Sequence, residues 1–114
     1  MENFTLERLE RYTLLRVNVP RLDVAIASAL KAEFVLLSGT MSHRVLLDLS
    51  ACKSCDSSGL GAILVGHRQC RDAGGRLVLT GLSPMVESLI AISHLDSVLA
   101  VACSQQEIES AFGG

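Results

Sequence analysis

The sequence predicts an α/β fold built on parallel strands. Two observations lead to this prediction: short apolar runs recur along the chain, and segments with helical spacing of apolar residues separate them. The regular alternation of strand and helix from residue 12 onward implies right-handed crossovers between parallel strands. A length of 114 residues fits one domain, 1–114, with a core of about residues 12–112.

The first third of the chain is expected to hold two strands and a helix. Residues 3–10 alternate weakly and are interpreted as an edge strand that pairs with the next one. Residues 12–19 are apolar enough for a better strand, and Pro20 ends it. A helix is predicted to open at residues 21–23, and its apolar spacing continues up to a C-cap. The C-cap is expected at 38–39 and a loop at 40–43.

The middle of the chain is predicted to bring a strand, a short loop and a helix start together. The near-continuous apolar run 45–49 is typical of a central parallel strand covered on both faces. After the loop, a helix follows from Ser57 to about Ala73, where Gly74-Gly75 ends it. The remaining elements are a strand at 76–80, a helix from Ser83-Pro84, a strand at 98–102 and a helix capped by Ser104 with Glu107.

The junction in the middle of the chain carries the polar residues of most interest. Asp56, Ser57 and Ser58 stand where the helix begins, and their side-chain oxygens suit a plain N-cap. Gly59 and Gly61 leave the first turn uncrowded, so that a partner could approach the backbone closely. A phosphate at this place would meet free N–H donors and the positive end of the helix dipole, so the junction also suits a phosphoserine. Spacing alone leaves both interpretations open.

The same junction and its flanking strands resemble a known family. The segments Leu47-Asp48-Leu49-Ser50, Asp56-Ser57-Ser58-Gly59-Leu60-Gly61 and Gly74-Gly75-Arg76-Leu77-Val78-Leu79 resemble the STAS domain of bacterial anti-sigma-factor antagonists. The resemblance covers about residues 12–101. It implies a STAS-like α/β fold with a mixed, mostly parallel sheet of four to five strands and about four helices.

The resemblance also implies roles for individual residues. In antagonists of the family, the serine directly after the motif Asp is phosphorylated, and here that residue is Ser57. Asp23 matches the family's Leu-Asp near the phosphorylation loop, and Asp48 matches its Asp-Leu-Ser strand end. Residues 19–21 depart from the pattern, because the family commonly has Gly shortly before Leu-Asp. The residues expected to bind the partner are Asp23, Asp56, Ser57, Ser58, Gly59, Leu60 and Gly61.

The function implied by the resemblance is regulatory. The unphosphorylated protein would bind an anti-sigma factor/serine kinase and release a sigma factor, phosphorylation of Ser57 would switch it off, and a phosphatase would reset it. The chain has no phosphate-binding Gly loop with Lys, so we expect it to need no cofactor of its own, with ATP and Mg²⁺ supplied by the partner kinase. An alternative is a constitutive STAS docking subunit of a transport or signalling complex without phosphorylation. We expect a monomer or a weak dimer.

Composition argues against other classes of partner. A net charge of −2 gives no basic footprint for nucleic acid. No apolar run approaches the roughly 20 residues of a membrane span, and the start Met1-Glu2-Asn3 lacks the features of a signal peptide. We therefore expect a cytoplasmic protein whose four cysteines are thiols.

The cysteines suggest a third hypothesis, a small cysteine-dependent enzyme. Cys52 and Cys55 form a single CxxC, and His67 and Cys70 share a helix face, so a metal or redox site can be imagined. We expect no metal, because one CxxC is weak evidence and a free Cys often packs as a small hydrophobe. The enzyme hypothesis requires a depressed thiol pKa at Cys52 or Cys55. No nucleophile elbow or Ser-His-Asp order is present, and no catalytic residue is expected.

Overall fold

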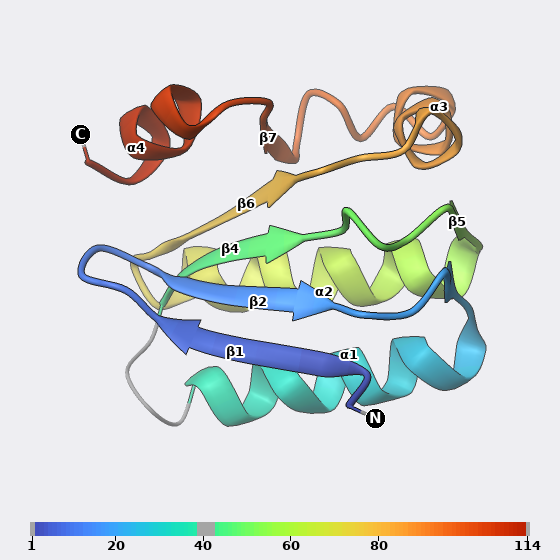
Figure 1. Ribbon diagram of the computed structural model, residues 1–114, viewed down its shortest axis with the longest axis horizontal. Coiled ribbons are helices and arrows are strands. Elements are labelled where there is room, and N and C mark those ends of the chain that lie inside the picture. The colour runs from blue at the N-terminus through green and yellow to red at the C-terminus, as the bar shows by residue number, and fades with distance from the viewer. Residues whose placement is uncertain (1, 39–42, 114) are drawn as a thin grey trace.

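A computed structural model describes residues 2–38 and 43–113 and shows a twisted sheet with helices packed against it (Figure 1). The order of the sheet is β1-β2-β4-β6-β7. The elements are β1 (Phe4–Arg8), β2 (Thr13–Val17), β3 (Arg21–Leu22), α1 (Val24–Ser38), β4 (Arg44–Asp48), β5 (Ser54–Cys55), α2 (Ser57–Asp72), β6 (Arg76–Thr80), α3 (Pro84–Ile92), β7 (Ala100–Ala102) and α4 (Gln105–Gly113).

The sheet is mixed and mostly parallel, as predicted. Strand β1 pairs with β2 in antiparallel fashion, which confirms the edge strand expected at residues 3–10. The pairs β2–β4, β4–β6 and β6–β7 are parallel, so that Leu15, Leu47 and Leu79 lie side by side on three neighbouring strands. With five strands in this sheet and four helices among the described residues, the predicted α/β architecture is confirmed.

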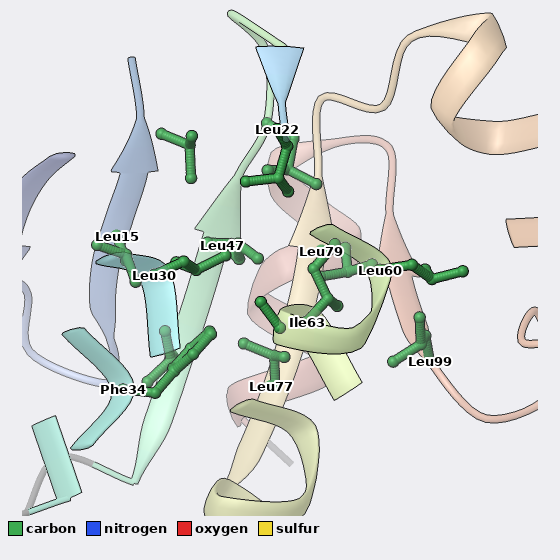
Figure 2. Packing of buried hydrophobic residues seen from close by; sticks show 14 of the residues in the cluster. Leu15, Leu22, Leu30, Phe34, Leu47, Leu60, Ile63, Leu77, Leu79 and Leu99 are labelled. Carbon is green, nitrogen blue, oxygen red and sulfur yellow. The ribbon is translucent and has the colours of Figure 1, made fainter. Parts of the chain in front are cut away.

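The main hydrophobic core lies between the sheet and the helices α1 and α2. Figure 2 shows leucines of β2, β4 and β6 together with core residues of α1 and α2. Leu47 is fully buried in this core, whereas its neighbour Leu46 is buried on the opposite face of β4. The predicted central strand is therefore covered on both faces. The opposite face is a smaller cluster with residues of α4: Leu46, Val78, Ala102, Ile108 and Phe112.

Helices α1 and α2 approach each other closely because α2 has a glycine at the contact. A Cβ built on Gly66 would lie 2.3 Å from the ring carbon Cζ of Phe34 in α1. Phe34 is 2 % exposed, so its ring fills the space that a larger residue at position 66 would need. This contact fixes the two helices as one layer over the sheet.

The prediction that a helix opens at residues 21–23 is wrong for Arg21 and Leu22, whereas Asp23 does stand at the start of the helix. Arg21 and Leu22 form the short strand β3, which pairs in parallel with Ser54 and Cys55 of β5, and α1 begins at Val24. The physical reason is a non-local ladder: Leu22 also accepts a hydrogen bond at its carbonyl oxygen from the Asp56 amide. The last strand is shorter than expected at Ala100–Ala102. Gly39 of the predicted C-cap and residues 40–42 of the predicted loop lie outside the described residues.

The later helix ends follow the predicted local chemistry. Ser83 Oγ accepts from the Val86 amide at 3.2 Å, and Pro84 occupies the first turn of α3. Ser104 Oγ accepts from the Glu107 amide at 3.2 Å, as expected for the cap of α4. The returning bond differs from a standard capping box, because Glu107 Oε1 accepts from the Cys103 amide rather than from the amide of the cap residue.

Candidate functional site

The candidate site lies at the carboxyl ends of the parallel strands, where β3 and β5 pair (Figure 1, right). The chain leaves β4 through Leu49, whose amide donates to the Thr80 carbonyl at 2.9 Å. The amides of Lys53 and Ser54 both donate to the Pro20 carbonyl, at 2.8 and 3.2 Å. The loop before α2 is therefore tied to the segment before α1, and the start of α2 has a fixed place beside the start of α1.

Asp56 is the N-cap of α2. Its backbone is extended, its Oδ1 accepts from the Gly59 amide at 3.0 Å, and its carbonyl oxygen accepts from the Leu60 amide at 3.1 Å. Ser57 is the first residue of the helix and is exposed, whereas Ser58 is half-buried. Because Asp56 performs the capping, the Ser57 hydroxyl is not needed for it and stands at the positive end of the helix dipole.

The two glycines of the motif differ in their surroundings. A Cβ on Gly59 would lie 2.5 Å from the Leu22 carbonyl oxygen and 2.8 Å from Cys55 Sγ. A Cβ on Gly61 would meet nothing within 4 Å. The close backbone approach at Gly59 is thus made by β3 of the same chain, and only Gly61 leaves space at the surface. Leu60, at 7 % exposed, packs into the main core (Figure 2).

Asp23 begins α1 as Asp56 begins α2. Asp23 Oδ1 accepts from the Ile26 amide at 3.2 Å, and the Asp23 carbonyl accepts from the Ala27 amide at 2.7 Å. Since Leu22 pairs with Cys55, the residues that follow them, Asp23 and Asp56, come side by side. Both line a hollow of about 100 Å³ at the surface. The structure therefore brings together the two aspartates that the resemblance linked to the loop.

Asp48 serves the fold of the neighbouring turn. Its Oδ1 accepts from the Ser50 amide at 2.9 Å and from the Ser50 hydroxyl, and its Oδ2 lies 3.1 Å from Arg16 Nε. Partial burial acts to raise the pKa of Asp48, but the hydrogen bonds from Ser50 and the Arg16 guanidinium outweigh it and hold that pKa below its ordinary value. The Asp-Leu-Ser strand end is therefore a stabilised turn beside the site.

The cysteines lack the activation that the enzyme hypothesis requires. Burial raises the pKa of Cys52 to about 11, and the Asp48 carboxylate adds to the shift. Burial raises the pKa of Cys55 to about 11 as well, with contributions from Asp56 and Cys52. The raised pKa values are the opposite of what the cysteine-dependent enzyme hypothesis requires, because burial and neighbouring carboxylates both disfavour the thiolate. Within the described ranges, no group of three or more His, Cys, Asp or Glu side chains could hold a metal ion.

A third helix start, which the sequence analysis predicted but did not place near the loop, joins the site. Ser83 Oγ donates to the Lys53 carbonyl at 3.1 Å, so the cap of α3 is attached to the loop before α2. The Ser83-Pro84 signal located this helix, but no local pattern could show where its start would lie. Exposed apolar side chains stand at both flanking helices, with Val24 of α1 and Met85 of α3 each more than half exposed. The site is a polar loop framed by three helix starts and apolar neighbours.

The described residues form a small α/β domain that presents an exposed serine at the start of a capped helix. A family model described as "Mlab, STAS domain" matches residues 19–101 of the chain. The protein belongs to the STAS domain family, which confirms the resemblance found in the sequence.

One curated relative and two solved structures match most of the chain. A protein of Bordetella bronchiseptica that carries the name anti-sigma factor antagonist BtrV is 35% identical over 88 residues. These residues are 77% of this chain and 76% of that protein. The crystal structure of TM1081 from Thermotoga maritima covers 97% of this chain and 95% of its own, with a TM-score of 0.90 and 21% identity. The Bacillus protein SpoIIAA in its phosphorylated form covers 94% and 97%, with a TM-score of 0.71 and 22% identity.

The helices of the described chain were also compared with the requirements of a membrane span. None of those in residues 2–38 and 43–113 is both long and apolar enough to cross a bilayer.

Proposed function

We propose that this protein is an anti-sigma-factor antagonist whose binding state is set by phosphorylation of Ser57. The observation that carries the proposal is the exposed Ser57 at the first position of α2, where Asp56 already caps the helix. The 35% identity to BtrV supports the general role. In this role the chain is a regulator and a kinase substrate, acts in the cytoplasm, and is not itself an enzyme.

In the unphosphorylated state, the surface around Ser57 docks on an anti-sigma factor that is also a serine kinase, and a sigma factor is released. The exposed members of this surface are Asp56 and Ser57, and Asp23, Ser58 and Gly61 are half-buried. Gly59 and Leu60 are buried, so they support the surface by packing beneath it.

The partner holds ATP and Mg²⁺ and carries out the transfer. A bond forms between Ser57 Oγ and the γ-phosphorus, the bond to the β-phosphate oxygen breaks, ADP leaves, and the hydroxyl proton passes to a base of the partner. The product adds about −1.5 to −2 charges. Within this chain, the amides at the start of α2 stabilise the phosphate. Across the interface, the added charge next to Asp23 and Asp56 weakens docking, until a phosphatase removes it.

The test uses purified protein with the cognate kinase and Mg-ATP, and peptide mass spectrometry locates the phosphate. We expect stoichiometric phosphate on Ser57, none in Ser57→Ala, and normal phosphorylation in the matched control Ser58→Ala. Ser57→Ala should also keep its affinity for the kinase after incubation with ATP, whereas the wild type loses it. Stoichiometric phosphorylation of Ser57→Ala would move the site to Ser58.

A second candidate is a constitutive STAS docking subunit of a transport or signalling complex. The exposed apolar residues Val24 and Met85 lie beside the loop and support this candidate, because apolar side chains of this kind are typical of interaction surfaces whether or not a serine is modified. Under this alternative Ser57 stays unmodified in the cell. Purification of the protein with its native partner distinguishes the two candidates, since one predicts an ATP-binding anti-sigma factor and the other a subunit of a transport or signalling complex.

A further inference from the structure

Helix α1 is apolar on its outer side as well as on its inner side. Ala27, Leu30, Phe34 and Leu37 face the core and are buried. The exposed residues of α1 are Val24, Ala25, Ser28, Lys31, Ala32, Val35 and Leu36. Lys31 carries the only charge among them, and Val24 and Leu36 are each 64% exposed. A helix that is apolar all round is normally buried on both sides, so we expect another protein surface to pack on the outer side of α1.

The outer side of α2 continues this surface. Ser57, Gly61, Leu64 and Arg68 recur at helical spacing and form one line along α2. Ser57 and Arg68 are exposed, and the two residues between them are half-buried. Helices α1 and α2 lie in one layer and both begin at the same end of the molecule (Figure 1). We call the combined surface the outer helical face; its members are the exposed residues of α1 named above together with Ser57, Gly61, Leu64 and Arg68.

The charges of the outer helical face are divided between its two ends. At the end where both helices begin, Asp23 and Asp56 are paired with no cation in the described part of the chain. At the other end, Arg68 and Arg71 are exposed. Arg68 has no ion pair within residues 2–38 and 43–113, and Arg71 lies 3.6 Å from the adjacent Asp72. The Asp23 and Asp56 carboxylates therefore stand at one end, with the exposed Arg21 and Lys53 in the adjoining segments. Arg68 stands at the other end, and the residues between them are mostly apolar.

We propose that this face binds the same face of a second copy, turned end for end. A two-fold axis that crosses the helices near Gly61 and Leu64 sets Ser57 and Asp56 of each copy opposite Arg68 of the other, and α1 covers α1. The alternative, with like ends together, would set α1 over α2, so that Asp56 of one copy lies opposite Asp23 of the other and Arg68 has no carboxylate of this face opposite it. Charge complementarity therefore selects the antiparallel dimer.

The size of the face indicates a weak and reversible dimer. Helices of 15 and 16 residues are about 22 and 24 Å long and lie about 10 Å apart, which gives a face of roughly 450 Å². Stable interfaces usually bury about 800 Å² of accessible surface per partner. The dimer would cover Ser57, so any other protein that docks there must first separate the two copies. The inference does not depend on phosphorylation of Ser57.

Sedimentation equilibrium of the purified protein at low salt, without ATP or kinase, tests the dimer. We expect dimer at concentrations on the order of 100 µM and loss of dimer as salt screens the end-to-end charges. Arg68→Glu should weaken self-association about tenfold, whereas Arg8→Glu, the same charge change on the exposed strand β1, should leave it unchanged. Circular dichroism verifies that both variants are folded.

A charge exchange makes the test specific for the antiparallel arrangement. Ser57→Lys should also weaken self-association, because it places a cation opposite Arg68. Mixing Ser57→Lys with Arg68→Glu should restore the dimer, since one contact becomes Lys to Glu and the other keeps Ser57 opposite Arg68. A wild type that stays monomeric at about 500 µM, or an Arg68→Glu effect no larger than that of Arg8→Glu, would overturn the proposal. Either result leaves phosphorylation of Ser57 to be judged by its own assay.

Discussion

The two glycines of the central motif should respond in opposite directions to the same substitution. In Gly59→Ala the new methyl group would lie 2.5 Å from the Leu22 carbonyl oxygen and 2.7 Å from Leu22 Cγ. The carbonyl oxygen is backbone held in the β3–β5 ladder, so relief requires β3 to move. In Gly61→Ala, two residues further along α2, the methyl group meets nothing within 4 Å.

The magnitudes follow from two opposing effects. Replacing Gly by Ala inside a helix stabilises it by up to about 1 kcal/mol. Overpacking against fixed atoms costs about 1–3 kcal/mol. We therefore expect Gly61→Ala to raise the free energy of unfolding by about 0.5–1 kcal/mol and Gly59→Ala to lower it by about 1–2 kcal/mol. For a chain of this size, each 1 kcal/mol corresponds to roughly 4 °C in Tm.

Urea and thermal unfolding followed by circular dichroism measure both variants against the wild type. If Gly59→Ala stabilised the protein as much as Gly61→Ala, β3 would not rest on the first turn of α2, and the account of the site would fail. A folded Gly59→Ala variant should also bind the partner more weakly, because separating β3 from α2 moves Asp23 away from Asp56.

Three further predictions concern single side chains. His94 follows the C-cap Ser93 of α3 and has a φ of 59°, so His94→Gly should raise the free energy of unfolding by about 0.5–1 kcal/mol in urea titrations, and no gain would contradict the strained turn. Because the pKa of Asp48 is lowered in the folded protein, its contribution to stability is present above the unfolded value of 3.8 and is lost as pH falls through the lower folded value. Asp48→Asn should therefore be less stable than the wild type at neutral pH, with a gap that closes in acid; a gap independent of pH would refute the assigned interactions. Among the thiols, the exposed Cys103 should react with a disulfide reagent at pH 8, whereas the buried Cys52 and the half-buried Cys55 react slowly until the protein unfolds. Equal rates would contradict the raised pKa values of about 11 of Cys52 and Cys55.

The parts of the fold that local chemistry determines could be predicted from the sequence. The cap at Asp56, the strand at 76–80 and the start of α3 at Ser83-Pro84 all depend on residues within a few positions of one another. The central strand was recognisable because burial on both faces leaves a continuous apolar run.

The parts that were missed depend on contacts between distant residues. Leu22 follows Pro20 and precedes an apolar helix, so its local pattern resembles a helix start, but pairing with Cys55 draws it into a strand. The hydrogen bond between Ser83 and Lys53 likewise joins segments 30 residues apart. For the site, the sequence indicated which residues are polar and near α2, but only the structure shows that Gly59 and Leu60 are turned into the protein.

The short ladder between β3 and β5 affects how the candidate site forms when the chain folds. Its partners are separated by the whole of α1 and β4, so the ladder is a long-range contact that depends on those elements bringing its two strands together. A peptide that contains the motif, or a chain stalled before its core has assembled, would carry the same residues around Ser57 without the neighbouring start of α1. Recognition would then act as a check on completed folding, since a partner that reads Asp23 and Asp56 together responds only to the finished domain.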